Sequence, residues 1–147
     1  MRRTLSALFA ATLLAIAAAP VLADEGDSYS EGNVVELSFI KVKPGMFEAY
    51  MSYLATTYKG LLEEQKKAGL VVDYAVYGAR AGSPSEPDLI LSVTYKNWAA
   101  LDGLEDKIEP ITSKAFGSEE KANQASINRE SMREVLGSEM IQELILK

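Results

Sequence analysis

The sequence predicts an α+β fold in which an antiparallel β-sheet carries helices on one face. Three observations favour this class. Segments 34–42, 70–80 and 88–96 are rich in β-branched and aromatic residues, which is typical of strands. Segment 44–67 repeats apolar residues at intervals of three and four, which is typical of an amphipathic helix. The 147 residues, 48% of them hydrophobic and 24% charged, have ordinary globular composition and the length of one domain.

The first predicted strand and helix meet at a proline. The strand VVELSFIKV (34–42) ends at Lys43-Pro44-Gly45, and Pro44 suits the first turn of a helix because no amide donor is needed there. The apolar stripe of this helix consists of Phe47, Tyr50, Leu54, Tyr58 and Leu61. Gly69 fits the left-handed position that ends many helices, so a second strand is expected from Leu70 to Arg80.

The second half of the chain repeats the pattern. The loop 81–87 is short, so strand 88–96 should form an antiparallel hairpin with the second strand. Asn97 is a suitable N-cap for a short helix that should stop at Pro110. A further helix, polar on most sides, is expected over 118–136; Gly137 would close it, and 138–146 would be the last strand.

The order β-α-β-β-α-β defines a ferredoxin-like sheet. The segments VELSFIKVKPG, KAGLVVDYAVY and DLILSVTYKNWAAL resemble the dimeric α+β-barrel superfamily, which includes antibiotic-biosynthesis-monooxygenase-like and stress-responsive barrel proteins. The resemblance covers roughly residues 34–108 and implies a homodimer in which two sheets close a barrel. A sheet with helices on one face also favours a partner, because its other face is otherwise exposed. The polar helix near 118–136 departs from the superfamily pattern.

The N-terminus has the organisation of a signal peptide. Arg2 and Arg3 precede the apolar run 5–19, and Val21-Leu22-Ala23 places small residues before a cleavage site after Ala23. The run is short for a membrane span, and an acidic segment follows at once. We therefore expect a signal peptide over 1–23, export by the general secretory route to the periplasm or the medium, and no membrane anchor after cleavage. Residues 24–32 are expected to form a flexible acidic tail, and 33–147 the domain.

Composition excludes several functions. The chain has no cysteine and no histidine, so disulfides, zinc fingers, thiolate nucleophiles and Ser-His-Asp triads are impossible. Removing Arg2 and Arg3 from the 15 basic residues leaves 13 against 21 acidic ones, a net charge of −8. Such a surface repels nucleic acids and anionic lipids, so neither is an expected partner. We also expect no cofactor and no metal.

Strand alternation suggests where a ligand would lie. Val35, Leu37 and Phe39 share one face, which we expect to pack on the helices together with the apolar face of strand 88–96. The opposite, mixed face would then line a cavity between the sheets, the usual setting for a small ligand. The candidate ligand-binding residues are Glu36, Ser38, Asp73, Tyr77, Arg80, Thr94 and Trp98.

Structural explanations compete with these roles. Trp98 at a helix start is most often a core residue, and Tyr77 in a strand a packed aromatic. Related haem-degrading enzymes use an Asn, a Trp and a His, and the lack of His excludes that activity here. Ser118-Glu119-Glu120-Lys121 matches a Ser-x-x-Lys motif, but an N-cap explains it fully. The acidic residues of 102–109 are best explained as a solvated helix face.

Three functions remain open from the sequence. The first is an exported, stress-associated or small-molecule-binding protein without a catalytic centre, taking an apolar or aromatic ligand. The second is a cofactor-independent monooxygenase or isomerase acting on a small aromatic substrate. The third is a protein-interaction module that uses the polar helix near 118–136.

Overall fold

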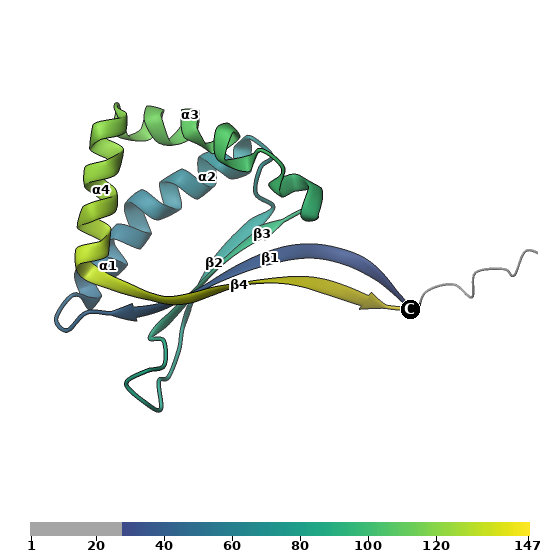
Figure 1. The fold of residues 1–147 in the computed structure, drawn as a ribbon, viewed down its shortest axis with the longest axis horizontal. Coiled ribbons are helices and arrows are strands. Elements are labelled where there is room, and N and C mark those ends of the chain that lie inside the picture. Colours follow the sequence, from purple (N-terminus) through teal and green to yellow (C-terminus); the bar gives the residue numbers. More distant parts are fainter. Residues whose placement is uncertain (1–27) are drawn as a thin grey trace, which may run out of the picture.

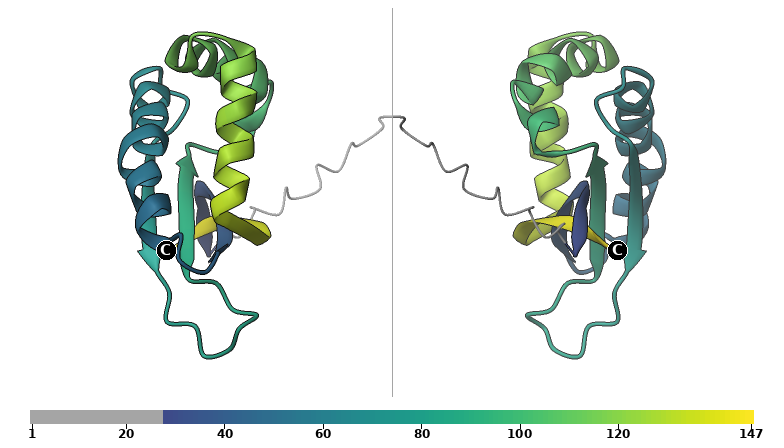
Figure 2. Two further views of the ribbon diagram at one scale, coloured as in Figure 1. Left: turned by 90° about the vertical axis from the view of Figure 1, so that its left-hand side faces the viewer. Right: turned by 90° about the vertical axis from the view of Figure 1, so that its right-hand side faces the viewer.

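A computed structural model describes residues 28–147, which form one sheet and a layer of helices on one of its faces (Figures 1 and 2). The predicted signal peptide and residues 24–27 of the predicted tail lie outside this range. The elements are β1 (Tyr29–Val42), α1 (Phe47–Tyr53), a π-helical stretch (Leu54–Tyr58), α2 (Lys59–Lys67), β2 (Asp73–Gly78), β3 (Leu89–Tyr95), a 3₁₀ turn (Trp98–Leu101), α3 (Leu104–Phe116), α4 (Glu119–Met132) and β4 (Arg133–Leu146).

The sheet has the predicted antiparallel topology. Its strand order is β2-β3-β1-β4, so β1 lies between β3 and β4. With the helices on a single face, the expected α+β arrangement is confirmed (Figure 2). Among the described residues, no helix is long and apolar enough to span a membrane.

Two strands are longer than the sequence predicts. β1 begins at Tyr29, because residues 29–31 pair with 144–146 of β4; residues 29–32 therefore belong to the strand and not to a flexible tail. β4 begins at Arg133, and Gly137 lies within it opposite Phe39, where the prediction placed a helix end. The register shifts by one residue beside this pair, so a bulge accommodates the glycine.

The first helix begins later than predicted. Pro44 lies in a turn, where Gly45 adopts a φ of 78°, and α1 starts at Phe47. The predicted end is confirmed: Gly69 has a φ of 73°, and its amide donates to the Lys66 carbonyl oxygen. Tyr50 and Leu54 of the stripe are buried, whereas Phe47 at the first turn is 47% exposed.

The second helical region extends beyond the predicted stop. Pro110 lies inside α3, which continues to Phe116, so the predicted end at this proline is wrong. The proline removes one backbone hydrogen bond from α3 but does not end it, and α3 contains no buried residue. Ser118 is the predicted N-cap of α4, since its Oγ accepts from the amide of Lys121 at 3.2 Å. α4 also lacks buried residues.

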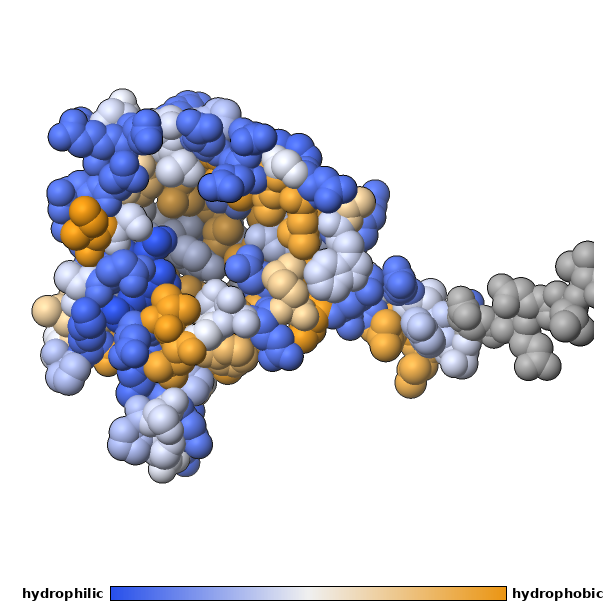
Figure 3. Space-filling model, viewed as in Figure 1, coloured by the Kyte–Doolittle hydropathy of each residue, from blue (hydrophilic) through white to orange (hydrophobic). Residues whose placement is uncertain are grey.

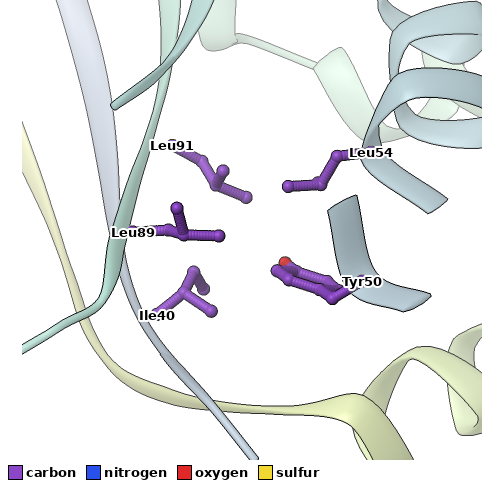
Figure 4. Packing of buried hydrophobic residues seen from close by; sticks show 5 residues of the cluster. All are labelled: Ile40, Tyr50, Leu54, Leu89 and Leu91. Carbon is purple, nitrogen blue, oxygen red and sulfur yellow. The ribbon is translucent and has the colours of Figure 1, made fainter. Parts of the chain in front are cut away.

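The core lies between the sheet and α1. Ile40, Leu89 and Leu91 of the sheet pack against Tyr50 and Leu54 (Figure 4). A smaller cluster of Leu62, Val71 and Tyr95 lies under α2. Tyr50 and Ile40 are fully buried, so α1 is the helix that fixes which face of the sheet is interior.

Candidate functional site

The two faces of the sheet divide the predicted ligand-binding residues. Residues directly opposite each other on neighbouring strands share a face. Glu36 and Ser38 lie opposite Val93 and Leu91, on the face that packs on the helices. The prediction for the first strand was therefore wrong by one residue: Val35, Leu37 and Phe39 lie on the open face. The fully buried Val34 and Ile40 decide this orientation, because they have the parity of Glu36.

The other predicted residues do not gather at one place. Thr94 lies opposite Asp73 on the open face, where the Asp73 carboxylate is 2.9 Å from Lys66 Nζ. Tyr77 is on the same face and 55% exposed, and Arg80 is exposed in the loop after β2. Trp98 is not a core residue: it is 46% exposed, and its indole N–H donates to Gln142 Oε1 at 3.0 Å.

The helix side of the sheet holds a cluster of protonated phenols. The Tyr95 hydroxyl donates to Glu36 Oε2 at 3.1 Å. Burial, and next the charge of Glu36, raise the pKa of Tyr95 above its usual range. Burial and then the neighbouring Tyr50 and Glu36 raise the pKa of Tyr58 in the same way. These side chains act at neutral pH as hydrogen-bond donors and not as bases.

A second part of this cluster joins α1 to the start of β4. Arg133 Nη1 donates to the Tyr50 hydroxyl at 3.1 Å, and the guanidinium carbon lies 5.9 Å from the centre of that ring. The Tyr50 ring stacks on Tyr53, with 6.1 Å between their centres. Arg133 Nη2 donates to Glu130 Oε1 at 3.0 Å. About 10% of the Arg133 side chain is exposed against 51% of the Glu130 side chain, so the guanidinium is shielded from solvent while its carboxylate partner is not.

Two arginine N–H groups in this region have no partner. The Nε atoms of Arg129 and Arg133 are both buried and form no hydrogen bond among the described residues. Arg129 Nε lies 3.7 Å from Glu130 Oε1, which is too far for a hydrogen bond, and its Nη2 donates to Ser126 Oγ at 3.2 Å. A buried donor without an acceptor is costly, so each of these groups would be stabilised by an added acceptor, of which an anionic oxygen is the strongest kind.

A cavity of about 290 Å³ opens beside these groups. Its lining comes from the helices α1, α2, α3 and α4: Tyr53, Leu61, Thr112, Phe116, Ala122, Asn123, Ala125, Ser126 and Arg129. In Figure 3 the molecule is hollowed between α3, α4 and the sheet. We call this cavity the tyrosine–arginine pocket and include in the name Tyr50 and Arg133, which do not line it: Tyr50 stacks on the lining residue Tyr53, and Arg133 donates to Tyr50. It combines apolar walls with positive charge, an arrangement suited to a small organic anion.

A larger groove of about 640 Å³ runs between α2 and α3, lined by residues such as Lys67, Ile111 and Lys114. It is open to solvent and contains no buried polar group without a partner. Among the described residues, no group of three or more acidic side chains is placed to hold a metal ion. The tyrosine–arginine pocket is therefore the candidate site.

Sequence reasoning missed its central residues. Tyr50 was treated only as part of the helical stripe, and the two arginines lay in a segment predicted to be a helix polar on most sides. One signal was present: Arg129 and Arg133 are four residues apart, the spacing that places side chains on one helix face. Nothing local in the sequence links that pair to tyrosines about eighty residues earlier.

No protein-family model matches this chain, and no curated protein matches it. Solved structures do. HapK from Hahella chejuensis aligns at a TM-score of 0.52 and 12% identity over 75% of this chain and 91% of its own. Protein SO0527 from Shewanella oneidensis aligns at a TM-score of 0.50 and 15% identity, over 80% of this chain and 96% of its own. A protein from an uncultured marine organism, described as a dimeric ferredoxin-like protein, aligns at a TM-score of 0.50 and 8% identity, over 80% of this chain and 98% of its own.

The fold is ferredoxin-like. The similarity spans nearly the whole of each neighbour, and it agrees with the strand order and the single helix layer described above. At these identities the likeness establishes the fold of this ferredoxin-like chain and not its activity.

Proposed function

We propose that this ferredoxin-like protein is an exported, homodimeric binding protein for a small aromatic or apolar molecule that carries an anionic oxygen. The observation that carries the proposal is the pair of buried, unpartnered Nε atoms of Arg129 and Arg133. An anionic oxygen bound in the cavity would supply the missing acceptor of Arg129, which lines it, and the aromatic and aliphatic walls would cover the rest of the ligand.

The local charge supports an anionic ligand. Two guanidinium groups lie beside one carboxylate, that of Glu130, and Lys43 Nζ donates to the Glu130 carbonyl oxygen at 2.8 Å. The arginines, and next to them Lys43, lower the pKa of Glu130, which therefore stays ionised at neutral pH. The site retains an excess of positive charge within a protein whose expected mature charge is negative, so the attraction of an anion is local.

The pocket favours binding over catalysis. The neighbouring phenols of Tyr50, Tyr58 and Tyr95 have raised pKa values and keep their protons at neutral pH. None of the three lines the cavity, and in their protonated state they cannot accept a proton from a substrate as a base would. The monooxygenase or isomerase and the interaction module stay predictions without a specific observation in their favour.

Calorimetric titration of the mature chain with benzoate tests the binding proposal. Benzoate should bind saturably, and benzyl alcohol, which lacks the charge, should bind at least tenfold more weakly. Arg129→Met should weaken benzoate binding by about 10- to 100-fold, because a hydrogen bond to a charged group is lost. Arg80→Met, in an exposed loop, is the matched control and should bind like the wild type. Equal affinity of the wild type and Arg129→Met would overturn the proposal.

The open face of the sheet supports the homodimer. Besides Val35, Leu37 and Phe39, it presents Ile90 and the 42% exposed Ile141. Covering such a face with a second copy removes apolar surface from water. One structural neighbour is described as dimeric, and the same assembly would close two sheets into a barrel here.

Two measurements test assembly and export. Sedimentation of the chain beginning at Asp24 should give a dimer, and a monomer at micromolar concentration would overturn the homodimer. The intact mass of protein recovered from the periplasm of an expressing bacterium should correspond to cleavage after Ala23. A mass that retains residues 1–23 would contradict export through a cleavable signal peptide.

A further inference from the structure

The strand pair at the end of β1 and β4 projects beyond the rest of the sheet (Figure 1). β3 pairs with β1 only from Val34 to Ile40, whereas β4 continues along β1 to the pair Tyr29 and Leu146. The Lys147 amide donates to the Ser28 carbonyl oxygen at 3.0 Å and closes the end of this ribbon. We call residues 29–31 and 144–146 the β1–β4 arm.

The arm carries exposed apolar side chains on both faces. Leu144 and Leu146 have the parity of the helix side and are 54% and 82% exposed; Ile145, on the opposite face, is 48% exposed. Tyr29, opposite Leu146, is 41% exposed. A two-stranded ribbon without a packed face is marginally stable in water, and apolar patches of this kind mark interaction surfaces.

The position of the arm points to a second copy of the chain as its occupant. Ile145 lies on the same open face as Ile141 and Val35, with Glu143 between it and Ile141, so a molecule that covers the face also meets the arm. A small ligand cannot cover both sides of a projecting ribbon. A membrane surface is a poor occupant because Glu31 and Glu143 flank the apolar residues and the expected mature charge is −8.

We propose that the β1–β4 arm is a clasp of the homodimer: the arm of each copy packs on the other copy and buries Leu144, Ile145 and Leu146. This inference rests on the proposed homodimer but not on the ligand. The pocket residues Arg129, Tyr50 and Arg133 all come from one chain, so the clasp and the pocket can be lost separately.

Sedimentation velocity over a range of concentrations tests the clasp. The variant Leu144→Asp/Leu146→Asp should raise the dissociation constant of the dimer at least 100-fold and still bind benzoate. Ile127→Asp on α4 is the matched control, because Ile127 is 63% exposed and lies away from the arm; this variant should stay dimeric. A dimeric arm variant would overturn the clasp alone. A monomeric wild type would overturn the homodimer and the clasp together.

A second measurement covers the case in which the arm variant fails to fold. The chain has no cysteine, so Ser30→Cys allows a single nitroxide spin label at the arm. Its motion should be slower in the dimer than after dilution to monomer, whereas a label at Ile127→Cys should be equally mobile in both. Equal mobility of the Ser30 label in the two states would overturn the clasp.

Discussion

Replacing Tyr50 by Phe removes the hydroxyl group that links the core to Arg133. Tyr50 is fully buried, and its hydroxyl accepts a 3.1 Å hydrogen bond from Arg133 Nη1. The variant leaves a second N–H of Arg133 without an acceptor, in a side chain that is about 10% exposed. A hydrogen bond to a charged group is worth about 1.5–3 kcal/mol, so the free energy of unfolding should fall by that amount.

Urea unfolding followed by circular dichroism measures the change, and a double-mutant cycle assigns it. In an Arg133→Met background the donor is already absent, so Tyr50→Phe should cost less than about 0.5 kcal/mol there. Tyr77→Phe removes an exposed hydroxyl and should lie within about 0.5 kcal/mol of the wild type. If Tyr50→Phe costs as much in the Arg133→Met background as in the wild type, the hydrogen bond is not the source of the stability.

Three further stability changes follow from the structure. Lys41 and a backbone amide donate to the Asp88 carboxylate and lower its pKa. This stabilisation is present above the pKa of Asp88 in the unfolded chain and is lost as the pH falls through the lower pKa in the folded protein. Asp88→Asn should therefore cost about 1 kcal/mol at pH 7 and make the free energy of unfolding depend less on pH below about pH 4. Gly60→Ala lies in α2 with open space around it and should raise the free energy of unfolding by about 0.5–1 kcal/mol, because alanine favours a helix more than glycine does. Gly45→Ala should lower the free energy of unfolding by about 1 kcal/mol in the same urea assay, because Gly45 has a φ of 78°. Pro110→Ala restores a backbone donor inside α3 and should raise the melting temperature, with a gain of about 1–2 kcal/mol; an unchanged melting temperature would show that α3 unfolds before the core.

The order of the elements was predictable because its signals are local. Alternating β-branched residues, the stripe of Tyr50 and Leu54, and the Ser118 cap each depend on neighbours within a few residues. The element boundaries were less predictable. Residues 133–137 end in a glycine that resembles a helix cap, but pairing with Lys41 and Val42 on β1 extends β4 through them instead. A pairing between residues ninety positions apart leaves no local pattern.

The orientation of β1 could not be decided from its own sequence. Val34 and Ile40 lie on one face and Leu37 and Phe39 on the other, so both faces are apolar enough to be buried. The choice depends on the residues that pack on the strand from other elements. Tyr50 of α1 packs on Ile40, and on the same side Glu36 accepts a hydrogen bond from the Tyr95 hydroxyl. The apolar face that remains is the open one, which is also the physical reason to propose a second copy there.

The polar helix α4 has an explanation that its sequence alone did not suggest. A helix that covers a core needs an apolar stripe; α4 lacks one, and only Met132 at its end packs, partly buried, against the core. It spans the hollow instead, with Ser118 capping one end and Arg129 and Glu130 near the other, where Glu130 also pairs with Arg133 of β4. The feature that α4 contributes to the cavity is therefore the positively charged side chain of Arg129. The Nε atoms of both arginines lack an acceptor, and the Glu130 carboxylate already accepts from Arg133. On the proposed function, α4 therefore serves to present Arg129 to an anion in the cavity, beside Tyr53.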